Sequence, residues 1–155
     1  MTEEVSIQPP PDFRGGILAD SMGLGKSLSV LALCAHTKNL ASGWHSRSQP
    51  SVSKSTLLIV PLSLLRTWED QISTHFYPGT LSCWRYHDSK RNIDTLCLAA
   101  YDIVLTTYDV VALQWRDCQK GLTPLFSITW SRIILDEGMY AFEPSCTASL
   151  NNIST

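Results

Sequence analysis

Two glycines, a lysine and a serine stand together near the amino end of the chain, in the string Gly23-Leu24-Gly25-Lys26-Ser27. Glycines let the backbone turn its N–H groups inward around an anion, and a helix that starts beside them adds a positive dipole end. The lysine can reach outer phosphate oxygens, and the serine hydroxyl can coordinate magnesium. The string fits the end of the phosphate-loop pattern G-x-x-x-x-G-K-[ST], with Asp20 in place of the first glycine. It predicts a site for a nucleoside triphosphate with Mg²⁺; the alternative is a glycine-rich turn before an ordinary helix.

A second candidate is the acidic pair Asp136-Glu137, which directly follows an apolar run at 132–135. At the carboxyl end of a parallel strand, Asp136 can hold magnesium directly or through water, and Glu137 can orient and deprotonate an attacking water. Alone, such a pair is an ordinary solvated loop, but a phosphate loop in the same chain favours the catalytic interpretation. We therefore predict Lys26, Asp136 and Glu137 as catalytic residues, and Ser27 and Asp136 as magnesium ligands.

The elements that must position these residues alternate between strand and helix patterns. Short apolar runs predict strands, and apolar residues at helical spacing predict helices. The predicted strands are 15–19, 56–60, 81–86, 102–106 and 132–135, and the predicted helices are 27–36, 63–76, 92–100 and 108–119. This alternation indicates an α/β domain with a mostly parallel sheet. The glycine loop would then join the first strand to the first helix.

The composition is that of one globular domain. The 155 residues are 44% apolar and 17% charged, with a formal net charge of -2, so no overall positive field indicates a polyanionic partner. We find no signal peptide and no apolar run near the roughly 18 residues of a membrane helix, which favours a cytosolic or nuclear setting. The 5 cysteines and 4 histidines have no metal-binding spacing, which argues against a zinc site or a disulfide framework. Cys34 and Cys97 are expected to be buried.

Four strings, in chain order, resemble motifs I, Ia, Ib and II of the Swi/Snf-type helicase-like ATPases, with most likeness to the DNA-repair branch that includes the helicase-like transcription factor. The strings are 15–27, 57–65 followed by Trp68, 101–108 and 130–138. In that family an aspartate at the position of Asp20 is normal. The resemblance implies a RecA-like P-loop NTPase lobe over residues 15–138, with ATP and Mg²⁺ as ligands, in a nuclear DNA-dependent ATPase of repair or chromatin remodelling. The ATP-binding residues that it implies are Asp20, Ser21, Met22, Gly23, Leu24, Gly25, Lys26 and Ser27.

The resemblance also implies a path for the backbone of duplex DNA along motifs Ia and Ib. Hydroxyl and backbone N–H groups at Ser63, Thr106 and Thr107 would contact phosphates, which needs no basic surface. Other roles stay open, because Ser63 could cap the following helix and the two threonines could simply end a strand. Leu62 and Leu65 are expected in the core.

Three features depart from the family pattern. Met139 stands where the acidic box continues with histidine, and a thioether cannot donate the hydrogen bonds of an imidazole. The third motif and the second lobe are missing, and no glutamine motif for adenine precedes residue 15. Since the strand of the third motif usually lies between the P-loop strand and the acidic-box strand, we expect an open sheet edge. The expected product is a truncated nucleotide-binding lobe that does not hydrolyse ATP alone.

Three segments lie outside the motifs. Residues 1–14 are a polar, proline-rich lead, residues 39–54 a flexible serine-rich insertion, and residues 139–155 a tail without family likeness, interpreted as translated intron or frameshifted sequence. Two other functions stay open: a non-functional fragment or pseudogene product and, less favoured, a P-loop kinase of a small metabolite, for which the arginines are too dispersed. The residues do not specify the oligomeric state, the preferred DNA structure or the direction of translocation.

Overall fold

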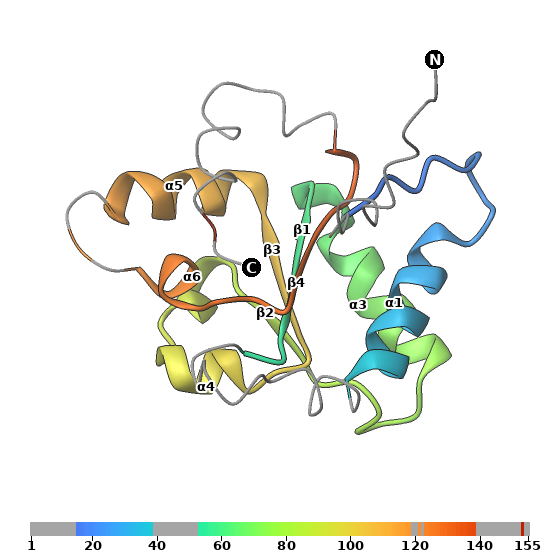
Figure 1. The fold of residues 1–155 in the computed structure, drawn as a ribbon, viewed down its shortest axis with the longest axis horizontal. Helices are drawn as coiled ribbons and strands as arrows, with labels where there is room; N and C mark the ends of the chain where they lie inside the picture. Colours follow the sequence, from blue (N-terminus) through green and yellow to red (C-terminus); the bar gives the residue numbers. More distant parts are fainter. Residues whose placement is uncertain (1–14, 39–52, 119–120, 122, 139–152, 154–155) are drawn as a thin grey trace, which may run out of the picture.

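The computed structural model describes residues 15–38, 53–118, 121, 123–138 and 153, which form an α/β unit around one sheet (Figure 1). The sheet has four strands in the order β2-β3-β1-β4, and every neighbouring pair is parallel. The strands are β1 (Thr56–Val60), β2 (Cys83–Arg85), β3 (Ile103–Thr107) and β4 (Arg132–Leu135). The predicted fold class and parallel sheet are confirmed.

Helices cover both faces of this sheet, with α1 and α3 on one side and α4, α5 and α6 on the other (Figure 1). Their bounds are Lys26–Thr37 for α1, Leu65–His75 for α3, Thr95–Ala99 for α4, Tyr108–Cys118 for α5 and Pro124–Ser127 for α6; short 3-10 helices span Leu62–Leu64 and Asp88–Arg91. The sequence patterns predicted these α-helices except α6. With 4 residues, α6 is too short to show a helical period.

The central strands β1 and β3 are buried along their whole length, as strands covered on both faces must be. Alternate residues point to opposite faces. Leu57, Ile59 and Val104 pack with α4, α5 and α6, whereas Leu58, Val60 and Leu105 pack with α1 and α3. Two continuous apolar layers therefore fix the sheet between the helices.

The predicted strand at 15–19 is wrong. Residues 15–20 have no regular structure, and the side chains of Ile17 and Leu18 are 95% and 52% exposed. The strand β4 pairs with β1 on one side, and no strand of the described ranges pairs with its other side. The open edge stays a prediction, and residues 15–19 form no ladder with any strand of the described ranges.

The structure also decides the expected burial of four side chains. Leu65 and Cys34 are buried as predicted, but Leu62 is 58% exposed and Cys97 is exposed, so the predicted burial of these two is wrong. Leu62 opens the 3-10 helix where the chain leaves the sheet, and Cys97 lies on the outer face of the short helix α4.

The flanking segments lie largely outside the described residues, namely 1–14, 39–52 and all of 139–155 except Ile153. At the end of the predicted insertion, Ser53 donates from its backbone to Thr129 O (2.9 Å) and from its hydroxyl to Ala99 O (2.8 Å). Ile153 is buried in the apolar layer beside α5. Within the described ranges, no helix has both the length and the apolar character needed to cross a bilayer.

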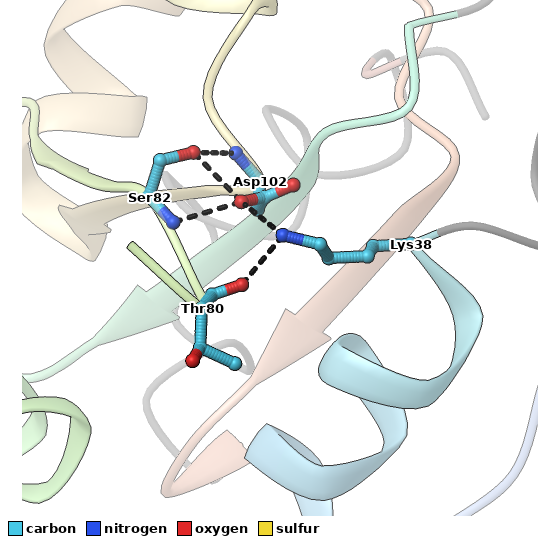
Figure 2. Close-up of polar contacts among 4 residues, drawn as sticks. All are labelled: Lys38, Thr80, Ser82 and Asp102. Carbon is cyan, nitrogen blue, oxygen red and sulfur yellow. Dashed lines mark hydrogen bonds and ion pairs between the residues drawn. The ribbon is translucent and has the colours of Figure 1, made fainter. Parts of the chain in front are cut away.

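A polar cluster ties α1 to the amino end of the sheet (Figure 2). The Asp102 carboxylate, directly before β3, accepts hydrogen bonds from Ser82 N (2.8 Å) and Ser82 Oγ (2.8 Å). Lys38, at the end of α1, donates to Thr80 O (2.5 Å) and forms an ion pair with Asp102 (3.5 Å). Since the last residues of α1 lie at the amino end of β3, the first residues of α1 lie toward the opposite, carboxyl end.

Candidate functional site

The glycine loop forms a tight turn that ends at the first residue of α1. Gly23 and Gly25 have φ angles of 84° and 74°, in the left-handed region that side chains disfavour. Apart from the glycine and its two chain neighbours, no heavy atom lies within 4 Å of the position that a Cβ would take on either glycine. Gly25 precedes α1 without a side-chain cap, and the first turn of the helix carries no acidic residue. Free N–H groups and an uncompensated positive dipole end at this point suit an anion.

The ammonium group of Lys26 folds back over the loop. Its Nζ donates to Asp20 O at 2.6 Å and to Ser21 O at 2.9 Å. An ammonium has three N–H donors, so one remains for a further acceptor. Ser21, Met22 and Leu24 are exposed, and Ser27 is partly exposed. The predicted loop residues are therefore together, open to solvent, and grouped around a cation.

The acidic pair directly follows β4, and the ribbon after β4 leaves the sheet at the end toward which α1 begins (Figure 1). Asp136 directly follows β4, and its backbone N–H donates to Ile59 O at 2.9 Å, extending the β1–β4 ladder by one bond. Because β4 is parallel to β1, Asp136 is at the carboxyl end of the sheet, to which α1 directs its first turn. In the described part of the chain, no hydrogen bond or ion pair joins the loop to Asp136.

Asp136 is held by two aromatic residues. The Trp68 indole Nε1 donates to Asp136 Oδ2 at 2.7 Å, and the Tyr108 hydroxyl donates to the backbone oxygen of Asp136 at 2.8 Å. The backbone N–H of Glu137 donates to Asp136 Oδ1 at 3.1 Å. Both carboxylate oxygens thus accept from neutral N–H groups, and no cation among the described residues pairs with this carboxylate.

Glu137 has an unusual backbone. Its φ is 51°, in the left-handed region that residues other than glycine seldom adopt, and its side chain is exposed. Such conformations carry a cost of about 1–3 kcal/mol and are concentrated at functional sites. This bend turns the chain away from β4 directly after Asp136. Met139, the expected departure from the family pattern, lies outside the described residues.

The side chains predicted to bind magnesium, Ser27 and Asp136, offer the oxygen ligands that this ion prefers. Mg²⁺ in nucleotide sites takes one or two carboxylates together with phosphates and waters, and Ser27 and Asp136 supply one hydroxyl and one carboxylate. Among the described residues, no cation pairs with the Asp136 carboxylate, so its negative charge is available to a metal ion. Within the described ranges, no cluster of three or more His, Cys, Asp or Glu could bind a metal by itself. The ion would therefore need the phosphates as further ligands.

The candidate DNA-contacting residues have different surroundings. Ser63 is exposed within the 3-10 helix that follows β1, and α3 has no side-chain cap, so the alternative role of Ser63 as a helix cap is wrong. Thr106 and Thr107 are buried at the end of β3. The Thr106 hydroxyl donates to Tyr86 O at 3.0 Å, and Thr107 Oγ1 accepts from Val110 N at 3.4 Å.

The thiols do not take part in this site. Burial raises the pKa of Cys83 to about 12 and also raises the pKa of Cys34, whose thiol donates to Thr56 Oγ1 at 3.8 Å. Both thiols are therefore protonated at neutral pH and weakly nucleophilic. Burial likewise raises the pKa of the Tyr86 hydroxyl, which donates to Gln114 Oε1.

Sequence reasoning did not identify the contacts of Trp68 and Tyr108 with Asp136. Trp68 was noted for its helical spacing and as part of the string that resembles motif Ia, and Tyr108 as the end of the string that resembles motif Ib; neither was given a partner. One signal was available, because a buried indole N–H usually finds an acceptor and α3 follows a strand that ends beside β4. The acceptor itself could not be named before the strand order was known.

Comparison with known proteins identifies the family. The family model described as "SNF2-related domain" matches residues 7–151, which extends beyond the motif-bearing range 15–138 at both ends. Transcription termination factor 2 of Drosophila melanogaster is 33% identical over 150 residues, covering 80% of this chain and 14% of that protein. DNA repair protein RAD5B of Arabidopsis thaliana is 34% identical over 158 residues, covering 86% of this chain and 12% of that protein.

A solved structure agrees with these sequence relatives. The SWI2/SNF2 ATPase core of Sulfolobus solfataricus, determined in complex with dsDNA, has a TM-score of 0.66 and 30% sequence identity; the match covers 88% of this chain and 25% of that one. The chain spans 12% to 20% of the length of the curated relatives. With the matching family model, the parallel sheet and the ordered motifs, the chain belongs to the SNF2-related family of helicase-like ATPases.

Proposed function

We propose that this chain is an ATP-binding lobe of an SNF2-type DNA-dependent ATPase, with Mg²⁺ bound beside the phosphates. The observation that carries the proposal is the loop of Gly23 and Gly25 around the Lys26 ammonium, placed at the first turn of α1 and at the same end of the sheet as Asp136. A phosphate chain bound there would meet backbone N–H groups and a cation, with a carboxylate at the same end of the sheet. Residues 20–27 would form the ATP-binding loop.

Each residue of this site then has a defined task. Lys26 would exchange its bonds to the loop carbonyls for outer phosphate oxygens, and the N–H groups of the loop would bind the inner phosphates. When bound by Ser27 and Asp136, Mg²⁺ neutralises phosphate charge. Glu137, exposed beside Asp136, would orient a water molecule and accept its proton. Hydrolysis by this chain alone is not part of the proposal, since the histidine after Gly138 is replaced by Met139.

The DNA part of the proposal rests on the relatives. The SWI2/SNF2 core with the similar fold was solved with dsDNA, and two of the proteins compared above are named for DNA repair and transcription termination. We assign a DNA-phosphate contact to Ser63, which is exposed and follows β1. For Thr106 and Thr107 the contact stays a prediction, because both hydroxyls are engaged inside the protein. By analogy with the same relatives, we infer a nuclear location and a role in repair or remodelling.

The Lys26→Ala variant tests the nucleotide site. Loss of a charge-assisted bond to phosphate of about 1.5–3 kcal/mol would weaken ATP binding roughly 10- to 100-fold. Binding of a fluorescent ATP analogue by the full chain, in the presence of Mg²⁺, measures this change. Lys90→Ala is the matched control, because it removes the same charge next to β2, at the far edge of the sheet from β4. Unchanged affinity in Lys26→Ala would refute the assignment of the loop.

Duplex DNA provides the second measurement. ATP hydrolysis by the wild-type chain is measured with and without DNA, alongside the binding assay. We expect ATP binding without DNA-stimulated hydrolysis. Absence of ATP binding would instead support the non-functional fragment, and DNA-stimulated hydrolysis would show that the chain is catalytic alone.

A further inference from the structure

Trp68 and Tyr108 reach Asp136 from two different helices, which pack on opposite faces of the sheet. Trp68 belongs to α3, on the face covered by α1, and Tyr108 is the first residue of α5, on the other face. Both side chains are nearly buried, at 3% and 6% exposure. The end of β4 is therefore clamped from both sides at the residue assigned to magnesium.

The bond from Trp68 has the geometry of a strong hydrogen bond. Its N···O distance of 2.7 Å lies at the short end of the range for N–H donors and within the range of bonds to charged acceptors. An indole is a donor only and cannot rotate its N–H away from the ring plane. The buried ring thus fixes the position of Asp136 Oδ2, and the Glu137 N–H fixes Oδ1.

These bonds leave the carboxylate able to bind a cation. A carboxylate offers about four lone-pair positions, and the two N–H donors occupy one on each oxygen. Neutral donors orient the group without cancelling its charge. In metal sites, partners of this kind hold the ligand in place, and their removal typically costs about 10- to 100-fold in metal affinity or activity.

We propose that Trp68 is a positioning residue for Mg²⁺ at Asp136, and that Tyr108 supports it by holding the backbone of the same residue. The proposal rests on the nucleotide site described above and adds to it a role for the indole N–H. A packing role alone would make Trp68 a contributor to stability with no effect on the metal. The two roles predict different results when the indole N–H is removed and an aromatic ring is kept: a positioning role predicts weaker binding of the metal, and a packing role predicts only lower stability.

The Trp68→Phe variant makes that change, and Trp130→Phe is its matched control. Trp130 is 0% exposed, and its Nε1 donates to Leu125 O at 2.9 Å in the apolar layer on the opposite face of the sheet. Both variants lose one indole hydrogen bond and replace a buried tryptophan with a smaller aromatic ring. The affinity for a fluorescent ATP analogue is measured in EDTA and in saturating Mg²⁺. The ratio of the affinity in Mg²⁺ to the affinity in EDTA is the gain in nucleotide affinity due to the metal.

We expect Trp68→Phe to reduce this gain about 10-fold and to leave the affinity in EDTA unchanged. Trp130→Phe should leave the gain at the wild-type value. Tyr108→Phe should reduce the gain less than Trp68→Phe, because its hydroxyl holds the backbone oxygen and not the carboxylate; Tyr86→Phe, which loses a bond to Gln114, is its control. An unreduced gain in folded Trp68→Phe, or an equal reduction in Trp130→Phe, would overturn the proposal.

An NMR measurement tests the contact between the Trp68 indole and Asp136 directly, and its first part needs no nucleotide. The indole N–H resonance of Trp68 in a ¹⁵N-labelled chain should shift on the Asp136→Asn substitution, whereas that of Trp130 should not. It should shift again when Mg²⁺ and ATP are added to the wild type. If the chemical shift of the Trp68 indole N–H is the same in Asp136→Asn as in the wild type, the contact itself is refuted. Should the wild-type chain not bind ATP, the proposed function fails, while this NMR comparison still decides whether Trp68 holds Asp136.

Discussion

Two aspartates lie at opposite ends of the same parallel sheet, and their partners differ in charge. Asp102 precedes β3, accepts two bonds from Ser82 and pairs with Lys38 (Figure 2). Asp136 follows β4 and accepts from Trp68 and from the Glu137 backbone, both neutral. One carboxylate is neutralised within the protein, and the other keeps its charge. The comparison indicates that the first fastens elements together, whereas the second is held ready for a cation.

The largest expected effect is on nucleotide binding by Asp136→Asn. The amide keeps the shape of the side chain, and its oxygen can still accept from Trp68, but the charge is lost. Attraction between two unit charges about 4 Å apart is about 4 kcal/mol at an effective dielectric constant of 20, and partial exposure reduces it. We expect the affinity for ATP in Mg²⁺ to fall roughly 100-fold, with little change in EDTA.

The matched substitution for this experiment is Asp102→Asn, which removes the same charge at the other end of the sheet. It should leave the affinity for ATP in Mg²⁺ unchanged. An equal loss of affinity in both variants would break the comparison, because it would show a general effect of charge and not a ligand at Asp136.

The next effect is on stability, and here Asp102 is the more sensitive residue. Asp102→Ala removes two hydrogen bonds from Ser82 and leaves the backbone N–H of Ser82 without its acceptor. At about 0.5–1.5 kcal/mol for each bond, we expect the free energy of unfolding to fall by about 2 kcal/mol. Urea denaturation followed by circular dichroism measures it. If Asp102→Ala lowered the free energy of unfolding by less than Asp136→Asn does, Asp102 would not be the residue that fastens these elements together.

The sequence predicted one of these two aspartates. Asp136 follows an apolar run and stands in an acidic pair, so that local pattern and family resemblance both pointed to it. Asp102 was included in a motif without a role, because its partners Ser82 and Lys38 are 20 and 64 residues away along the chain. Such contacts depend on the strand order, which a single sequence does not state.

The same limit explains which elements were predicted well. Strands β1 and β3 are central and covered on both faces, and their apolar runs gave the position of β1 without error and that of β3 to within one residue. Residues 15–19 have an equally apolar core of Ile17 and Leu18, yet form no strand, because local composition cannot supply a neighbouring ladder. The loop that follows precedes a helix as predicted, since glycines with positive φ and the start of α1 are local properties. Its predicted place directly after a strand is wrong, and its binding of phosphate stays a prediction.

The smallest expected effect concerns the ion pair of Lys38 with Asp102. Its atoms are 3.5 Å apart, and the two side chains are 28% and 24% exposed. Pairs with this much contact with water contribute about 0.2–1 kcal/mol, and salt screens them. We expect Lys38→Met to lower the free energy of unfolding by about 1 kcal/mol in dilute buffer, because the bond to Thr80 O is lost with the ion pair, and by less in 1 M NaCl. Urea denaturation at the two salt concentrations measures both values, with Lys90→Met as the control.

The Lys38→Met variant separates the two kinds of contact that Asp102 makes, the ion pair with Lys38 and the hydrogen bonds from Ser82. Lys38→Met removes the cation and its bond to Thr80 O but leaves both bonds from Ser82 to the carboxylate. A loss equal to that of Asp102→Ala would mean that the ion pair, and not the serine, holds α1 and β3 together. If the loss is small and vanishes in salt, the neutral bonds carry the cluster, and the two aspartates then differ in whether their charge is compensated and not in how they are held.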